Sequence, residues 1–454
     1  ESGLKVLRTN PAPCRPTTTE EFSMSLGCFL CFLFLWLSFS RTWQHEVCLL
    51  QTKLEIKASR KDEGSIAFAK QSVELKREVD VVSFNASQLT GHNIASTTGS
   101  SAWETQKRNV LFIVADDLIP MISGLNPEAA HMHTPHLNAF LKESLVLTNS
   151  HAQQALCAPS RASVLFGRRP DTMHVWNAED TGNMRAFCKT CKTIPQMFKD
   201  AGYYTIGMGK VFDDGGGEEE LLDAVQQDPQ SWSDPAFAGQ NWFYGTTNES
   251  TDSSWEIVDE NATGPLQDSQ VRDYAVTWLR ALIARNTTQP WFLAAGFRKP
   301  HLPFACPEEF YDLYNIKDTK LASNPFAPQD MPSIAWPEDG ELLNYYDITA
   351  TGYTAAINET MDNAKAKELL RGYQACVSYL DHNVGVLLNE LKLLGNWNST
   401  IIVFLSDNGF KLGEHGLWAK RTNFYPDTRA PMMLRIPELT DGGVVSDALV
   451  EHVD

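Results

Sequence analysis

The chain has 454 residues, of which 43% are hydrophobic and 21% charged, and its formal net charge is -18. These proportions are ordinary for a globular protein with room for two or three domains. The acidic balance argues against general nucleic-acid binding, which needs a basic face, but it leaves room for a local basic pocket that holds a small anion.

The N-terminal part of the chain carries signals of export. The first methionine, Met24, opens an apolar run that is short for a membrane span of about 20 residues. We therefore predict that residues 24–40 are a signal peptide, with a signal anchor as the alternative. Residues 1–23 would then be an untranslated leader or a cytoplasmic tail. Six Asn-x-Ser/Thr sequons also favour a glycoprotein of the secretory pathway: Asn85, Asn248, Asn261, Asn286, Asn358 and Asn398.

Regular structure is predicted mainly from residue 107 onward. Residues 41–106 are polar with a Ser/Thr/Gly-rich end, which is typical of a stalk or linker with some helical content. Asn109–Ala115 is a continuous apolar run, typical of a strand buried on both faces of a parallel sheet. Further strands and helices are then expected in the order helix 194–201, strand 203–208, helix 268–285, strand 291–296, helix 363–394, strand 400–405 and strand 431–436.

This alternation predicts an α/β fold with a largely parallel central sheet and helices on both of its faces. Residues 107–454 are expected to form one catalytic domain. Two segments, 213–265 and 312–362, are polar and rich in Pro, Gly and Asp, so they are predicted to be long surface insertions.

Oxygen-bearing side chains follow two of the predicted strands. Asp116 and Asp117 follow the first strand, and Asp407 and Asn408 follow a later one. Sites in open α/β sheets form at the carboxyl ends of strands, and three carboxylates with one amide suit calcium or magnesium. The alternative is a helix cap followed elsewhere by a turn, because Asp and Asn favour both.

Cysteine usage points to one unusual residue. Cys188 and Cys191 form a lone CxxC, which is read as a disulfide or two free thiols rather than a zinc site. Cys157 stands in Leu156-Cys157-Ala158-Pro159-Ser160-Arg161. A helix beginning near Ser160 would direct its amides toward residue 157 and favour an anion there, and Arg161 would pair with that anion. Alone, Cys157 would be read as a buried thiol or a plain thiolate nucleophile.

The Cys157–Arg161 segment resembles the C-x-P-S-R signature of formylglycine-dependent sulfatases, members of the alkaline phosphatase superfamily. Matching blocks run through most of residues 107–437, although Phe166 stands where the family usually has Thr. The resemblance implies a sulfatase-like fold, and it implies that a formylglycine-generating enzyme of the endoplasmic reticulum converts Cys157 to formylglycine (3-oxoalanine). It also implies a calcium ion held by residue 157 with Asp116, Asp117, Asp407 and Asn408.

Roles for cationic residues follow from the same resemblance. Arg161 and Lys210 would bind sulfate oxygens, His301 would help to protonate the leaving alcohol, and Lys420 would bind the sulfate or the ester oxygen. Their alternatives are a surface lysine at a helix end, a packed loop histidine and a solvated Lys420–Arg421 pair. Asp213 stands where the family has a histidine. This departure puts turnover in doubt more than sulfate capture, since a carboxylate near sulfate is repelled and is a weak base.

We therefore predict a sulfuric ester hydrolase that acts on a sulfated oligosaccharide or polysaccharide, by resemblance a 2-O-sulfated uronic acid of a glycosaminoglycan. The expected location is the lysosome, with secretion or the Golgi as alternatives, and membrane attachment only through an uncleaved signal anchor. The rival functions are a phosphohydrolase or phosphodiesterase of the same superfamily and a catalytically impaired protein that binds sulfated glycans. A C-terminal subdomain of the family is expected to be truncated in this sequence.

Overall fold

A seven-stranded, largely parallel sheet is the centre of the fold. The structure is a computed structural model that describes the backbone of residues 47–52 and 79–84 and, in full, residues 107–177, 180, 184–213, 228–233, 252–337 and 340–454. The strand order is β13-β4-β12-β9-β3-β7-β5, and only β12 runs against its neighbours. The strands are β3 (Asn109–Asp116), β4 (Leu145–His151), β5 (Tyr204–Gly209), β7 (Trp291–Pro300), β9 (Thr400–Ser406), β12 (Met432–Arg435) and β13 (Val444–Glu451).

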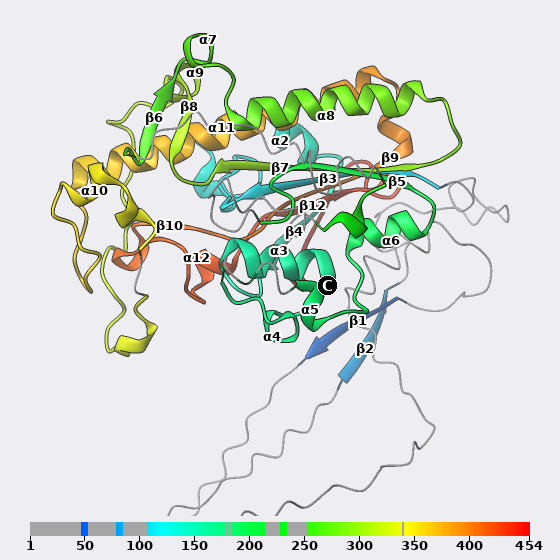
Figure 1. Ribbon diagram of the computed structural model, residues 1–454. Helices are drawn as coiled ribbons and strands as arrows, with labels where there is room; N and C mark the ends of the chain where they lie inside the picture. The colour runs from blue at the N-terminus through cyan, green and yellow to red at the C-terminus, as the bar shows by residue number, and fades with distance from the viewer. Residues whose placement is uncertain are drawn as a thin grey trace, which may run out of the picture.

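Helices cover both faces of this sheet (Figure 1). On one side lie α2 (Pro135–Leu141), α8 (Gln267–Ala284) and α11 (Asn363–Leu393), and on the other lie α3 (Cys157–Phe166) and α6 (Ile194–Asp200). Strand β3 supplies apolar side chains to both layers: Leu111 and Ile113 pack with α8 and α11, whereas Val110 and Phe112 pack on the α3 side. A strand whose residues are all apolar can be covered on both faces because side chains alternate along it.

The long helix α11 is fixed at its start and along its length. Asp362 caps it, since its side chain accepts hydrogen bonds from the amides of Ala364 and Lys365. Apolar residues recur every three or four positions, so one stripe faces the sheet and α8. Further along, the Asp381 carboxylate accepts hydrogen bonds from the amides of His136 and Leu137, in the first turn of α2. This contact joins the two helices over the same face.

Short elements fill the connections. A strand pair, β6 (Trp255–Val258) and β8 (Phe304–Pro307), lies beside α9 (Glu308–Tyr311), and β1 (Val47–Thr52) pairs with β2 (Val79–Phe84). The remaining elements are η3 (Pro127–Ala129), α4 (Pro170–Met173), α5 (Met184–Phe187), η6 (Pro229–Ser231), α7 (Glu260–Thr263), η7 (Ser333–Ala335), η8 (Leu342–Asn344), α10 (Tyr346–Thr349), η9 (Trp397–Ser399), β10 (Lys411–Leu412), η10 (Glu414–Gly416), β11 (Trp418–Ala419) and α12 (Tyr425–Thr428).

The predicted fold class is confirmed, and all five predicted strands and all three helices are present within a few residues of their expected bounds. Two strands of this sheet, β13 at its edge and β4 beside it, were not predicted. Their side chains are only partly buried, so neither shows the continuous apolar run of a central strand. The expected leader and signal segment lie outside the described residues, as does most of the expected stalk. Within the described part of the chain, no helix combines the length and hydrophobicity needed to cross a membrane.

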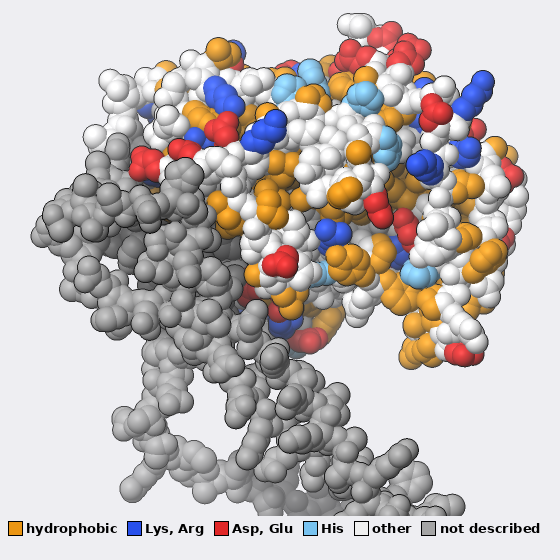
Figure 2. Space-filling model, turned by 180° about the vertical axis from the view of Figure 1, so that it is seen from behind, with side chains coloured by type: hydrophobic (Ala, Val, Ile, Leu, Met, Phe, Trp, Pro, Cys, Tyr) orange, Lys and Arg blue, Asp and Glu red, His pale blue; other side chains and the backbone are white. Residues whose placement is uncertain are grey.

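The back of the molecule has a mixed surface. Figure 2 shows Lys and Arg side chains interspersed with Asp and Glu, so neither sign dominates this face. A surface of this kind lacks the single basic stripe that nucleic-acid-binding domains present.

Candidate active site

The carboxyl ends of β3 and β9 bring the predicted oxygen ligands together. Ala115 lies beside Ser406 in the parallel pairing of the two strands. The next residues therefore meet at the sheet edge, where the amide of Asp117 donates a hydrogen bond of 3.0 Å to Asp407 Oδ1. Asp117 has a left-handed backbone, with φ 62°. Such a conformation is uncommon for a residue other than glycine and often marks a functional turn.

These side chains form a buried oxygen cluster. Single carboxylate oxygens of Asp116, Asp117 and Asp407 lie within 4.8 Å of one another. All three residues are fully buried, as is Asn408, whose Nδ2 donates a hydrogen bond of 2.8 Å to Asp117 Oδ1. Among the described residues, Asn408 Oδ1 has no hydrogen-bond partner although it is buried. An unsatisfied amide oxygen beside three carboxylates fits a hard divalent cation.

The turn that carries Asn408 depends on a glycine. A Cβ atom on Gly409 would lie 1.9 Å from the carbonyl oxygen of Pro426. The chain also folds back there, because the amide of Gly409 donates a hydrogen bond of 2.7 Å to the carbonyl oxygen of Asp427. Behind it, the Lys411 ammonium pairs with the Asp427 carboxylate, and both side chains are fully buried. This pair anchors the loop between Asn408 and Lys420.

Cys157 lies at the start of helix α3 and faces the oxygen cluster. The helix begins at Cys157 itself, three residues earlier than expected from Pro159 and Ser160, with Leu156 as its N-cap. The Cys157 Sγ donates a hydrogen bond of 3.2 Å to Asp116 Oδ1. Burial and the charge of Asp116 raise the pKa of this thiol well above its usual range. The unmodified thiol therefore stays protonated and is a poor nucleophile, which counts against a plain thiolate.

Three cations surround the carboxylates, and all three are buried. Arg161 Nε lies 2.9 Å from Asp407 Oδ2, and Lys210 Nζ lies 2.6 Å from Asp116 Oδ2. Lys420 Nζ lies 2.6 Å from Asp117 Oδ2. The alternatives of a surface lysine and a solvated pair are therefore excluded for Lys210 and Lys420. A small anion bound here would meet three positive charges in a site shielded from water.

Close backbone packing places Lys210. It follows β5, and its amide donates a hydrogen bond of 2.9 Å to the carbonyl oxygen of Gly296 on β7. A Cβ atom on Gly209 would lie 2.1 Å from that oxygen, and a Cβ atom on Gly296 would lie 2.1 Å from the carbonyl carbon of Lys210. Gly209 also has a φ of 65°. Only glycine fits both positions, so the local sequence directs the lysine into the site.

His301 follows β7, and a residue that sequence reasoning missed lies against it. His301 Nε2 lies 3.1 Å from Glu341 Oε1 and 3.8 Å from Asp117 Oδ2. Glu341 belongs to the segment 312–362, predicted only as a surface insertion, and it also lies 3.3 Å from Lys420 Nζ. Nothing in its local sequence marks it as a site residue.

Asp213 lies at the edge of the site. Its Oδ1 is 3.4 Å from Lys210 Nζ, and its side chain is 5% exposed. Burial lowers the pKa of the Arg161 guanidinium, but Asp407 and Asp116 raise it above its usual range, and Asp213 adds a smaller increase. The residue in the histidine position is thus an acid paired with a cation.

Three groupings of metal-ligand atoms share this region. Besides the Asp116–Asp117–Asp407 cluster, Asp116 groups with Cys157 and His301, and Asp117 groups with His301 and Glu341. The cluster of three aspartates joins carboxylate oxygens alone, and the unpartnered Oδ1 of Asn408 lies beside it. Since hard cations prefer oxygen ligands, we regard this cluster, with Asn408, as the candidate metal centre.

Other predicted polar residues have structural contacts. Lys299 is buried and donates a hydrogen bond of 2.8 Å to the carbonyl oxygen of Pro303. Arg169 forms an exposed ion pair with Glu451. His415 lies against Phe424. Cys188 and Cys191 form a disulfide, one of the two alternatives expected for them.

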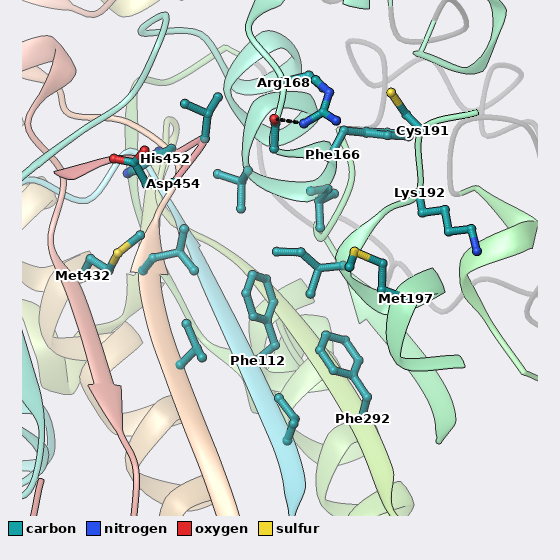
Figure 3. A pocket seen from close by; sticks show the side chains of 18 of the residues that line it. Phe112, Phe166, Arg168, Cys191, Lys192, Met197, Phe292, Met432, His452 and Asp454 are labelled. Carbon is teal, nitrogen blue, oxygen red and sulfur yellow. Dashed lines mark hydrogen bonds between the residues drawn. The ribbon is translucent and has the colours of Figure 1, made fainter. Parts of the chain in front are cut away.

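A separate hollow lies on the α3 side of the sheet. It has a volume of about 300 Å³ and is walled mainly by apolar side chains of β3, β7, β9 and β12. Figure 3 shows Phe112 and Phe292 projecting from their strands, with His452 and Asp454 at one end and Arg168 near α3. Because these walls are largely apolar, the hollow does not resemble an anion site.

The fold and the site define a class of protein: an α/β fold with a buried, oxygen-lined centre that three cations surround. Residues 108–454 match the family model named Sulfatase. The chain belongs to the sulfatase family. This confirms the resemblance indicated by the Cys157 segment.

Individual relatives agree with this assignment. The chain is 34% identical over 355 residues to iduronate 2-sulfatase of Mus musculus, which covers 76% of this chain and 62% of that protein. For the Homo sapiens protein of the same name the identity is 35% over 345 residues, covering 74% and 61%. A sulfatase of Formosa agariphila is 32% identical, covering 77% and 68%. The chain thus spans just over three fifths of the two iduronate 2-sulfatases.

Solved structures share the fold at low identity. BT4656 in complex with its substrate D-glucosamine-2-N,6-O-disulfate has a TM-score of 0.56 and 22% identity, covering 76% of this chain and 74% of that one. The phosphonate monoester hydrolase of Agrobacterium radiobacter has a TM-score of 0.54 and 17% identity, covering 76% and 72%. The fold alone therefore does not choose between sulfate and phosphonate esters.

Proposed function

We propose that residues 107–454 form the catalytic domain of a sulfuric ester hydrolase that removes sulfate from a sulfated sugar. The observation that carries this proposal is the position of Cys157. This residue of the sulfatase signature lies 3.2 Å from a carboxylate of the buried oxygen cluster, with three cations around it. The iduronate 2-sulfatases among its relatives support a 2-O-sulfated uronic acid of a glycosaminoglycan as the substrate.

The proposed cofactor is a calcium ion. Asp116, Asp117, Asp407 and Asn408 would hold it together with residue 157, since they offer only oxygens once Cys157 is converted to formylglycine. Such an ion would neutralise the clustered carboxylates and acidify a hydroxyl of the hydrated aldehyde. The unsatisfied Oδ1 of Asn408 supports this assignment.

The residues of the chain divide the chemistry between two sides of the substrate. One hydroxyl of the hydrated residue 157 loses its proton to a carboxylate of the buried cluster and attacks sulfur, and the bond from sulfur to the sugar oxygen breaks. Lys210 and Arg161 neutralise the sulfate oxygens. His301 gives a proton to the departing sugar oxygen, beside the ammonium of Lys420. The second hydroxyl of residue 157 then loses its proton, sulfate leaves and the aldehyde returns.

Asp213 is expected to slow the last step. We predict that Asp213→His raises the steady-state rate of sulfate release about 10- to 100-fold, because imidazole is a better general base near neutrality than an ion-paired carboxylate. The rate of alcohol release in the first turnover should change little. Rapid-quench measurement of the burst and the steady state checks both. An equal or slower steady state in the variant would contradict a role for this position in turnover.

The phosphohydrolase is kept as an alternative because a phosphonate monoester hydrolase shares the fold. Rates on matched aryl sulfate and aryl phosphate esters distinguish the two functions. The sulfatase proposal predicts a higher kcat/KM for the sulfate. A preference for the phosphate would overturn it, and binding of heparin-like chains without release of sulfate would support the impaired-enzyme alternative.

We also propose that the apolar segment 24–40 directs the chain into the secretory pathway, with the lysosome as destination. Conversion of Cys157 by the formylglycine-generating enzyme would occur along this route. Expression with and without residues 24–40 tests this, since only the former should yield glycosylated protein carrying the aldehyde.

A further inference from the structure

A carboxylate lies on the leaving-group side of the site. Glu341 precedes η8 and reaches the cluster from the segment 312–362, with 13% of its side-chain surface exposed. One oxygen, Oε1, contacts two of the proposed catalytic side chains at once: it lies 3.1 Å from His301 Nε2 and 3.3 Å from Lys420 Nζ. These two side chains come from different loops, and Glu341 bridges them.

The imidazole of His301 is fixed at both nitrogens. Its Nδ1 lies 2.6 Å from the carbonyl oxygen of Leu302. A carbonyl oxygen only accepts, so Nδ1 carries a hydrogen in this contact. The other nitrogen, Nε2, faces Glu341 and the site. Without substrate, a carboxylate at that position accepts the hydrogen of Nε2 and fixes the direction of the ring; when substrate is bound, the departing oxygen takes this same hydrogen.

Glu341 is suited to this task because it is held as an anion. Burial alone would raise its pKa, but Lys420, His301 and Arg421 together hold the pKa well below its usual range. Asp117 contacts the same two side chains, yet Asp117 is also a proposed ligand of the metal ion. Of the two carboxylates, Glu341 is the one that lies outside the cluster of three aspartates.

We infer that Glu341 is a positioning residue for proton donation to the leaving oxygen, acting through His301 and Lys420. This role rests on the proposed sulfatase function and adds a residue to its leaving-group side. Lys210 and Arg161 contact Asp116 and Asp407, so the sulfate-binding side does not depend on Glu341. Replacing Glu341 should therefore harm the departure of poorly acidic alcohols far more than that of acidic ones.

The test compares Glu341→Gln with the wild type on a series of aryl sulfates. For phenyl sulfate, whose leaving oxygen needs a proton, the first-turnover rate of phenol release should fall about 100-fold. For 4-nitrophenyl sulfate, whose leaving group departs readily as an anion, the fall should be less than about fivefold. Glu341→Asp should give a difference between the two esters that is intermediate between those of the wild type and Glu341→Gln. Glu368→Gln, which removes a carboxylate paired with Lys365 at 2.8 Å, should match the wild type.

The results on the ester series separate the role of Glu341 from the sulfatase function. An equal loss of rate on all esters, or no loss, would overturn the role of Glu341 while leaving the sulfatase function intact. A wild type that hydrolyses no aryl sulfate, although residue 157 carries the aldehyde, would remove both. If thermal unfolding shows that Glu341→Gln is not folded, the same comparison in Glu341→Asp and in a His301→Asn background decides. Loss of His301 should already make the first-turnover rate depend steeply on the acidity of the leaving alcohol. Adding Glu341→Asp to that variant should then change the dependence little.

Discussion

Replacing Cys157 by alanine is expected to lower kcat for sulfate esters by at least about 10⁴-fold, since it removes the group that forms the covalent intermediate. Sulfate binding should persist, because Arg161 and Lys210 are untouched. Serine at position 157 should fail as well, because it offers one hydroxyl and cannot regenerate an aldehyde. Sulfate release measured by ion chromatography, with binding followed by calorimetry, checks both parts.

The matched control is Cys376→Ala. Cys376 is also a buried free cysteine, but it lies within α11. Its replacement should lower the free energy of unfolding by about 1 kcal/mol and leave kcat unchanged. Mass spectrometry of the peptide carrying residue 157 gives an independent check. An active protein from the secretory pathway that carries only the unmodified thiol would contradict the proposed mechanism.

Removing the divalent ion is expected to destabilise the protein more at pH 7.5 than at pH 5. In the ion-free protein, burial and the neighbouring Asp116 and Asp117 raise the pKa of Asp407 to about 7, although Arg161 opposes them. An aspartate in the unfolded chain has a pKa of about 3.9. Between these values the folded state binds more protons than the unfolded state, so the free energy of unfolding of the ion-free protein falls as pH rises from about 4 to about 7.

A bound cation reverses this loss because it stabilises the ionised carboxylate. The contribution of Asp407 is at most about 4 kcal/mol, and a cation at 100 times its dissociation constant adds about 2.7 kcal/mol. Chemical unfolding with calcium and with a chelator, at both pH values, measures the difference. A calcium effect that is absent, or larger at pH 5, would contradict the assignment.

Two variants separate the sources of this pH dependence. Asp407→Asn should abolish the calcium-dependent stabilisation. Burial also raises the pKa of Asp381 to about 7, and this carboxylate caps α2 rather than facing the cluster. Asp381→Asn should therefore remove a background fall in stability that calcium does not affect.

Much of the site was predictable because most of its residues lie in a few short stretches of the sequence. Asp116 and Asp117 follow a fully apolar strand, and Asp407 and Asn408 follow another, so a parallel pairing of the strands was enough to bring them together. The Cys157 segment was predictable because its five contiguous residues form a distinctive pattern. The central strands were also predictable, since burial on both faces requires an unbroken apolar run.

Other features depend on contacts that no local pattern encodes. The strand β13 at the edge of the sheet and its neighbour β4 are partly exposed, and each is defined by the strand that it pairs with. Lys411 and Asp427 form a buried pair 16 residues apart that anchors the loop carrying Lys420.

The sequence by itself determined the family, the central sheet and the residues whose chemistry the family shares. Only the tertiary structure decided that Glu341 belongs to the site, 79 residues away from Lys420 in the chain. An isolated Glu in a polar segment resembles any surface acid. Its place beside His301 and Lys420 is created only by the folding of distant segments.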